Sequence, residues 1–169
     1  NNNEKNYIVG RKCTMEVGIK MATKNRSLNF WAGIFFGLGA IAFIDETVFH
    51  QLLHWHHFYD KSTLAVGLIS DGLFHAFSWF ATVASLFMVA HLRKLRAWDK
   101  RSWLGAAILG AGVFQLYDGI IQHKVFQLHQ IRYDVEIFYY DLVWNVLAIF
   151  MILIGWGLMK PKQKQVRAT

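Results

Sequence analysis

The sequence predicts an all-α integral membrane protein, a four-helix bundle made of two repeated helical hairpins. Three observations lead to this fold class. Four apolar stretches are each long enough to cross a hydrocarbon core of about 30 Å as a helix. Lysine and arginine are concentrated in three segments beside these stretches. One histidine-containing segment also occurs twice at a constant spacing, which is typical of an internal repeat.

The four apolar stretches cover residues 28–53, 70–92, 103–128 and 137–159. The first is too long for a signal peptide, and it ends in acidic residues and histidines. The second and the third each contain an aspartate and a histidine near one end. The fourth holds the uninterrupted run VLAIFMILIGWGL at 146–158. A soluble helix bundle needs a polar face on every helix, so we predict four transmembrane helices.

We predict a single transmembrane domain over residues 28–159, with repeat halves at about 30–92 and 103–159. Residues 1–27 form a polar, basic extension that we expect to be disordered in part, and residues 160–169 form a basic tail. Met21 begins a more usual lead-in to a first helix, so we expect the natural start there. The single cysteine, Cys13, excludes an internal disulfide and a cysteine-based metal site.

The repeat lies within residues 33–57 and residues 105–130, where matched positions are 73 residues apart. The matched ionisable pairs are Asp45 with Asp118, His50 with His123, and His56 with His129. Small residues at four positions are matched too, and we expect them to let the first and third helices pack closely. These are Gly37, Gly39, Gly110 and Gly112. Because matched helices run in the same direction, we predict a pseudo-two-fold axis along the membrane normal.

Lysine and arginine are unevenly distributed between the loops. They are frequent before residue 28, at 93–101 and after residue 159, and scarce at 54–69 and 129–136. The positive-inside rule therefore predicts both termini in the cytoplasm and the histidine-rich ends facing outward. Nucleic-acid binding is the other interpretation of the net charge of +7. We do not expect it, because the charges flank membrane segments without interleaved aromatic residues.

Polar residues of the second helix fall in one narrow stripe at helical spacing. The stripe consists of Asp71, His75, Ser78, Thr82 and Ser85. A lipid-facing surface would not carry such residues, so we expect the stripe to face the bundle interior.

Polar residues of the first helix fall on two faces. Glu46, His50 and His57 lie within about 40° of one another at α-helical spacing. Asp45 and His56 share a different face. This grouping requires the helix to continue as far as His56.

The polar residues on the predicted outer side form the candidate metal site. Ionisable residues are costly inside an apolar segment, so their recurrence in both halves requires a reason. The main candidate ligands are His50, His56, His75, His123, His129, Asp45, Asp71 and Asp118, and the secondary candidates are Glu46, His54, His57 and Asp141. Imidazole and carboxylate groups without thiolates suit Cu, Zn, Fe or Mn. A carboxylate beside a histidine also fits the arrangement in which it orients a metal-binding imidazole.

Three other interpretations stay open. Histidines beside Trp55 are also typical of a belt at the membrane interface, and this alternative applies most to His54 and His57. Haem held between two helices by His50 and His123 is a second alternative, which the nearby acids disfavour. Carboxylates and histidines inside a membrane also occur in proton relays.

Four motifs resemble an uncharacterised family of small bacterial membrane proteins, classed as a domain of unknown function. They are IDETVFHQLLHWHH, SDGLFHAFSW, YDGIIQHKVFQLHQIR and YDLVWN, within residues 30–158. The resemblance implies four membrane helices but no established activity. It also points toward the neighbourhood of respiratory-oxidase assembly proteins, and so toward copper. The family more often has paired histidines at the end of the third helix, where this chain has Gln130 after His129, which argues against a ligand at Gln130.

Two functions are consistent with these features. One is a membrane metalloenzyme that oxidises or hydrolyses a lipid or quinone entering between the helices. The other is a copper carrier or assembly factor that serves a respiratory oxidase. Acidic residues at the site and the absence of methionine near it favour the first narrowly. The sequence leaves open whether the protein is an enzyme, which metal it holds, its oligomeric state and its partners beyond the bilayer.

Overall fold

The computed structural model describes residues 2–160, with side chains described from residue 15 onward. It has four long helices, α1 (Asn2–Asp45), α2 (Leu64–Lys94), α3 (Lys100–Tyr117) and α4 (Ile137–Met159). Helices α1 and α3 continue as the short π-helical segments η1 (Glu46–Leu52) and η2 (Asp118–Val125). No strand is present among the described residues, and four helical spans are long and apolar enough to cross a membrane. The predicted all-α fold with four membrane-spanning helices is therefore confirmed.

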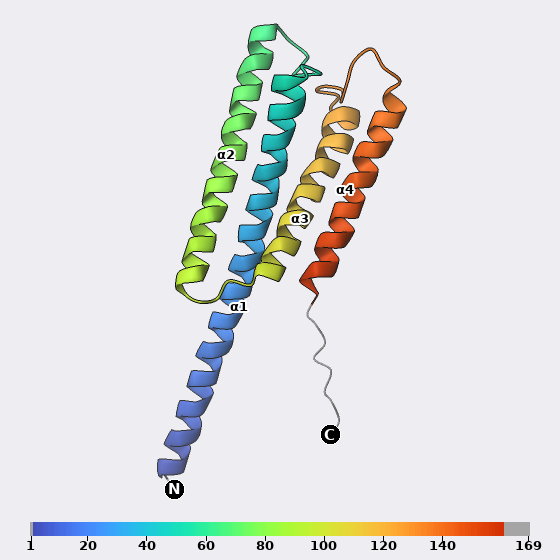
Figure 1. Cartoon of the computed structure of the whole chain (residues 1–169). Coiled ribbons are helices and arrows are strands. Elements are labelled where there is room, and N and C mark those ends of the chain that lie inside the picture. The colour runs from blue at the N-terminus through green and yellow to red at the C-terminus, as the bar shows by residue number, and fades with distance from the viewer. Residues whose placement is uncertain (1, 161–169) are drawn as a thin grey trace.

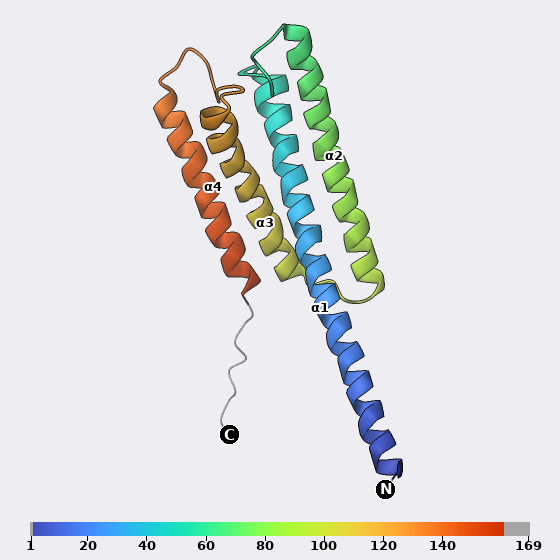
Figure 2. The same ribbon diagram turned by 180° about the vertical axis from the view of Figure 1, so that it is seen from behind.

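The helices lie side by side in the order α2, α1, α3, α4 (Figures 1 and 2). Helices α1 and α3 pack together in the middle, α2 packs on α1, and α4 packs on α3. Each hairpin thus contacts the other through its first helix. Helix α1 begins and α4 ends at one end of the molecule, and the α1–α2 and α3–α4 loops lie at the opposite end (Figure 1). This arrangement is compatible with the pseudo-two-fold axis, which stays a prediction.

Two matched glycines allow the close approach of α1 and α3. A Cβ atom on Gly110 would lie 2.7 Å from the backbone oxygen of Ile34, and one on Gly37 would collide with the backbone of Ala107. Only glycine leaves room for these contacts, since any side chain would push the two helices apart. Both glycines therefore lie at the contact between α1 and α3.

The other two matched glycines pack each hairpin internally, which corrects the expectation that all four face the α1–α3 interface. A Cβ on Gly39 would lie 2.7 Å from the Ser78 carbonyl oxygen of α2. A Cβ on Gly112 would lie 2.8 Å from the Ala148 carbonyl oxygen of α4. Gly39 and Gly112 each lie two positions after a glycine of the α1–α3 contact, and two positions along a helix bring a residue to a different side of it. Each of them therefore contacts the other helix of its own hairpin.

The segment before the membrane domain is helical where it is described. We expected residues 1–27 to be disordered in part, whereas α1 runs without interruption from Asn2. No proline interrupts this segment, because the only proline of the chain is Pro161. Apart from Lys160, the predicted basic tail at 160–169 lies outside the described residues.

The loop between α2 and α3 is pinned to α1 by a buried amide. The Asn29 side chain donates to the Ala97 carbonyl at 2.8 Å and accepts from the Asp99 N–H at 2.8 Å. Asp99 in turn caps α3 by accepting from the backbone N–H groups of Arg101 and Ser102, at 3.1 Å each. These contacts set where α3 starts relative to α1, and so align the far ends of both helices.

Candidate metal centre

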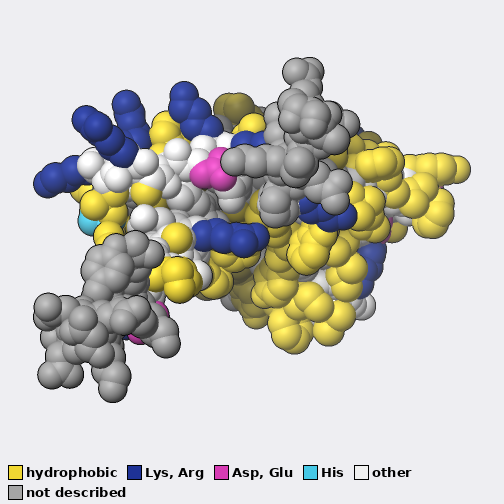
Figure 3. Space-filling view, turned by 90° about the horizontal axis from the view of Figure 1, so that it is seen from below, with side chains coloured by type: hydrophobic (Ala, Val, Ile, Leu, Met, Phe, Trp, Pro, Cys, Tyr) yellow, Lys and Arg dark blue, Asp and Glu magenta, His cyan; other side chains and the backbone are white. Residues whose placement is uncertain are grey.

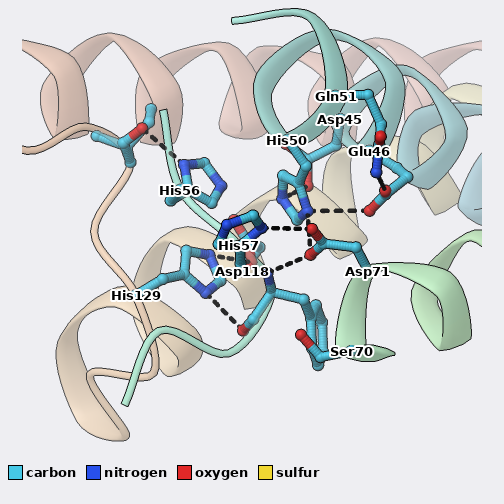
Figure 4. A network of polar contacts seen from close by, with 12 residues as sticks. Asp45, Glu46, His50, Gln51, His56, His57, Ser70, Asp71, Asp118 and His129 are labelled. Carbon is cyan, nitrogen blue, oxygen red and sulfur yellow. Dashed lines mark hydrogen bonds and ion pairs between the residues drawn. The ribbon is translucent and has the colours of Figure 1, made fainter. Parts of the chain in front are cut away.

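The candidate metal centre lies where α1 and α3 end, next to the loops that follow them (Figures 1 and 4). Both helices here change to π geometry, in η1 and η2. In a π-helix each N–H pairs with the carbonyl five residues back, and such segments are frequent at functional sites. Residues five apart therefore approach each other. The His50 Nε2 atom lies 3.8 Å from the Asp45 carboxylate, and the His123 Nε2 atom lies 3.1 Å from the Asp118 carboxylate.

This geometry corrects the face expected for Asp45. At continuous α-helical spacing, Asp45 and His50 fall on different faces. In the structure Asp45, His50 and His56 form one group, the first triad, whose possible ligand atoms all lie within 4.8 Å of one another. The π turn brings the first two together. The helix then ends at Leu52, and His54, with a left-handed φ of 49°, turns the chain so that His56 returns to the centre.

The second half forms a matched group of Asp118, His123 and His129, the second triad. Its possible ligand atoms also lie within 4.8 Å of one another, and the His129 Nε2 atom lies 3.6 Å from the Asp118 carboxylate. Gln127, which matches His54, has the same left-handed turn, with φ of 50°. Both halves thus bring together the ionisable residues that the repeat pairs.

Each half supplies the hydrogen bond that orients a histidine of the other half. The His56 Nδ1 atom donates to the Ile131 carbonyl at 2.9 Å, and the His129 Nδ1 atom donates to the Phe58 carbonyl at 3.0 Å. Because a carbonyl only accepts, both rings present an Nε2 lone pair to the centre. Burial, helped by the neighbouring His129, lowers the pKa of His56 to about 2, so its ring is neutral at physiological pH. The two contacts fall at positions matched at the spacing of 73.

The four triad histidines form one compact cluster. The His56 and His129 rings stack with centroids 4.5 Å apart and an interplanar angle of 4°. His50 lies 4.5 Å from His56, and His123 lies 4.8 Å from His129, between ring centroids. All four residues are at most 5% exposed, and among the described side chains their Nε2 atoms have no hydrogen-bond partner. A buried polar atom left unpaired costs about 1–3 kcal/mol, so four in one place indicate a ligand-binding centre.

Asp71 of α2 supports the first triad from outside (Figure 4). Its Oδ1 atom lies 3.0 Å from His50 Nδ1 and accepts from the Phe58 N–H at 2.7 Å. Its Oδ2 atom lies 2.6 Å from His57 Nδ1. The Glu46 carboxylate lies 2.9 Å from His50 Nδ1 as an ion-pair contact, beside the hydrogen bond between this nitrogen and Asp71. An imidazole held in this way presents Nε2 in a fixed direction and becomes a stronger metal ligand.

The matched support in the second half is looser and carries a different charge. Asp141, which matches Asp71 at a spacing of 70, lies 3.8 Å from His123 Nδ1 and pairs with Lys124. Gly119 stands where the first half has Glu46, and a Cβ there would lie 2.7 Å from a tryptophan of α4. The two triads therefore have the same ligands, but the first has more negative charge around it.

Three candidates from the sequence lie outside the cluster. His75 was expected as a main ligand, but it is exposed and its ring lies 5.6 Å from that of Phe43. The buried face of α2 contains Asp71, Phe74 and Ser78, and His75 falls beside that face. His54 is exposed at its turn, and His57 is half-buried and contacts Asp71.

Sequence reasoning missed two kinds of contact. Gln51 and Lys124 are matched at the spacing of 73, and each contacts a carboxylate beside its own triad. Extending the repeat comparison to polar uncharged residues would have found them. The carbonyl groups of Phe58 and Ile131 orient two histidines, but backbone atoms leave no signal in residue type.

Four apolar helices with ionisable residues buried at one end define a small multi-pass membrane protein. The chain belongs to the family described as "Predicted membrane protein (DUF2243)", whose sequence profile matches residues 32–162. This confirms the resemblance carried by the four motifs. Comparison with curated proteins and with solved structures found no match. The family description gives a location without an activity, so the function is inferred from the site.

Proposed function

We propose that the chain is a membrane metalloprotein that holds two transition-metal ions, one on each triad. The observation that carries this proposal is the convergence of four buried Nε2 atoms without hydrogen-bond partners and two carboxylates. Neutral imidazoles and ionised carboxylates are the forms that bind metal. Two oriented Nδ1–H groups, on His56 and His129, leave the opposite nitrogen available for this purpose.

The ligand set favours a reactive metal over a purely structural one. Two histidines and one carboxylate leave coordination positions open, as in non-haem iron sites, and also suit zinc or copper. Such a metal, when bound, activates water or oxygen. The side chains of this chain hold and orient it, and Asp71 and Glu46 strengthen His50 as a ligand through its Nδ1 atom. We therefore infer a catalytic site that acts on a membrane-dissolved substrate.

The arrangement of the cluster favours metal ions over haem. His50 and His123 are the two histidines that would serve as axial ligands on facing helices. The stacked rings of His56 and His129 lie against both of them and fill the space that a porphyrin would need.

We also infer the orientation in the membrane. Lysine and arginine side chains gather at the end of the molecule that Figure 3 shows, opposite the histidine cluster. Arg93, Lys94 and Lys100 are exposed there, next to the start of α3. The positive-inside rule then favours cytoplasmic termini and a metal centre in the outer half of the bilayer. A bacterial cytoplasmic membrane is the location that the family resemblance implies.

Elemental analysis of the purified protein, as isolated and after metal reloading, tests the proposal. We expect about two ions per chain. A double variant, His50→Ala with His123→Ala, removes one ligand from each triad and should lose both ions. The matched control is His54→Gln, which introduces the residue that the second half has at this turn and should keep the metal. Wild-type protein that holds less than about 0.2 ions per chain in both preparations would contradict the proposal.

Metal exchange separates a catalytic site from the alternative, a copper carrier. The ligands are at most 5% exposed, which favours slow exchange. We expect the metal to survive a chelator challenge, and turnover to be lost in His123→Ala while the helix content persists. Rapid transfer of copper to the chelator would instead identify a carrier.

A further inference from the structure

A groove beside the metal centre runs between α1 and α4, two helices whose described residues do not pack on each other. Its volume is about 510 Å³. Five aromatic side chains line it: Phe49, Trp55, Tyr139, Tyr140 and Trp144. A concave, largely apolar space of this size is typical of a site for one small molecule.

The groove opens sideways at the depth of the predicted membrane. On its rim Ile44, Val143 and Leu147 are 50%, 58% and 51% exposed, and all three lie in membrane-spanning helices. A molecule dissolved in the hydrocarbon region therefore reaches the groove without crossing the aqueous phase.

The inner wall of the groove holds one carboxylate, that of Asp45. This residue of the first triad is 4% exposed, and its Oδ1 atom has no hydrogen-bond partner among the described residues. Its Oδ2 atom faces His50. A buried carboxylate oxygen without a partner is costly, and a hydroxyl group on the occupant would donate to it.

Arg132 holds two of the aromatic walls in place. Its guanidinium carbon lies 4.8 Å from the centre of the Trp55 ring, and its Nη1 atom donates to the Tyr140 hydroxyl at 2.8 Å. Cation–π and hydrogen-bond contacts together fix these rings relative to each other. The groove is thus pre-formed, which lowers the entropic cost of binding.

A matched groove on the other side of the bundle does not reach a carboxylate. It lies between α2 and α3, its volume is about 310 Å³, and each of its eight lining residues matches one of the larger groove at a spacing of 73 or 70. Phe74 stacks on Phe58 at 4.9 Å and on Phe114 at 5.8 Å, between ring centroids. Asp118, the match of Asp45, is not among the lining residues of this groove, so the two grooves form a natural comparison.

We propose that the groove between α1 and α4 binds a ring compound that carries a hydroxyl group and an apolar tail, the chemistry of a membrane quinol. The ring packs among the aromatic side chains, and the hydroxyl donates to Asp45 Oδ1. The tail leaves between Ile44 and Val143 into the bilayer. Reaction of the bound compound rests on the proposed function, because this position places the hydroxyl beside a metal ligand. Binding itself needs only the groove.

Binding of decylubiquinol to metal-free protein in phosphatidylcholine nanodiscs tests the proposal. Val143→Trp fills the groove and should weaken binding at least about tenfold. The matched control, Leu73→Trp, places the same side chain at the matched position of the smaller groove and should leave the affinity within about twofold. Asp45→Leu should weaken binding of the quinol about tenfold and leave binding of its dimethyl ether, which has no hydroxyl to donate, unchanged.

The outcomes separate this proposal from the proposed function. Equal losses in Val143→Trp and Leu73→Trp, or no loss in either, would overturn the groove assignment. Equal affinity for the quinol and its dimethyl ether would also overturn it, and would identify an apolar chain as the occupant. Metal content is measured on the same wild-type and Val143→Trp preparations. Normal quinol binding in a protein that takes up no metal would refute the metal centre alone.

Discussion

Replacing Asp71 with asparagine should weaken metal binding at the first triad while leaving the fold intact. Asp71 makes three contacts within 3.0 Å, to the Nδ1 atoms of His50 and His57 and to the N–H of Phe58. Asparagine keeps one oxygen that accepts, so the bond from Phe58 is retained. It removes the negative charge that polarises the His50 ring, and its amide places hydrogens toward His57.

The magnitude follows from the loss of charge at one imidazole. Hydrogen bonds to charged groups contribute about 1.5–3 kcal/mol and neutral ones about 0.5–1.5 kcal/mol. Losing a carboxylate that supports a metal-bound histidine lowers metal affinity about 10–100-fold. That range corresponds to about 1.4–2.8 kcal/mol, which agrees with the loss of one charge-assisted bond to His50.

Competition titration with a chelator of known affinity measures this change, using Co²⁺ as a spectroscopic probe of the site. Asp141→Asn is the matched control, since its carboxylate lies 3.8 Å from His123 Nδ1, beyond hydrogen-bond distance. We expect Asp141→Asn to change affinity by less than about threefold. Equal weakening by both variants, or none by Asp71→Asn with unchanged circular dichroism, would refute the orienting role of Asp71.

Three further predictions concern packing, charge and orientation. Gly110→Leu should lower the free energy of unfolding by about 1–3 kcal/mol, seen as a lower Tm, whereas Gly72→Leu, with nothing within 4 Å of its Cβ position, should not; equal Tm values would contradict the close approach of α1 and α3. Lys124→Gln removes a cation beside the second triad and should tighten metal binding there severalfold in the same titration; weaker binding would show that Lys124 supports the site. After replacement of the native cysteine, Ser62→Cys should react only with reagent added outside and Lys94→Cys only with reagent added to the cytoplasmic side, and the reverse pattern would invert the orientation.

The sequence predicted the membrane fold and most of the cluster because both depend on order along the chain. Four apolar runs give four spans in the structure. The spacing of 73 paired His50 with His123 and His56 with His129, and these residues meet at the ends of α1 and α3. A repeat of this kind carries information about neighbours in space, since two similar halves place matched residues in similar surroundings.

Helical periodicity alone was less informative near the helix ends. His75 shares an α-helical stripe with Asp71, yet it is exposed and only Asp71 reaches the site. Asp45 and His50 fall on different faces of an α-helix, and the π turn of η1 brings them together. A small change of helical pitch redirects side chains by tens of degrees, and residue type does not signal where that change occurs.

Residue order alone predicts four helices long and apolar enough to cross a membrane, and it shows that the ligand-type residues recur in pairs. The length of an apolar run and the spacing of residues are properties of the chain, and they do not depend on contacts between helices. Which nitrogen His56 and His129 present to the centre depends on the folded molecule, because each ring is oriented by a backbone carbonyl of the other half. The packing also decides that Asp45 lines one groove while its match, Asp118, does not line the other. These features depend on backbone carbonyls and on side-chain contacts between distant helices, which exist only once the helices have packed.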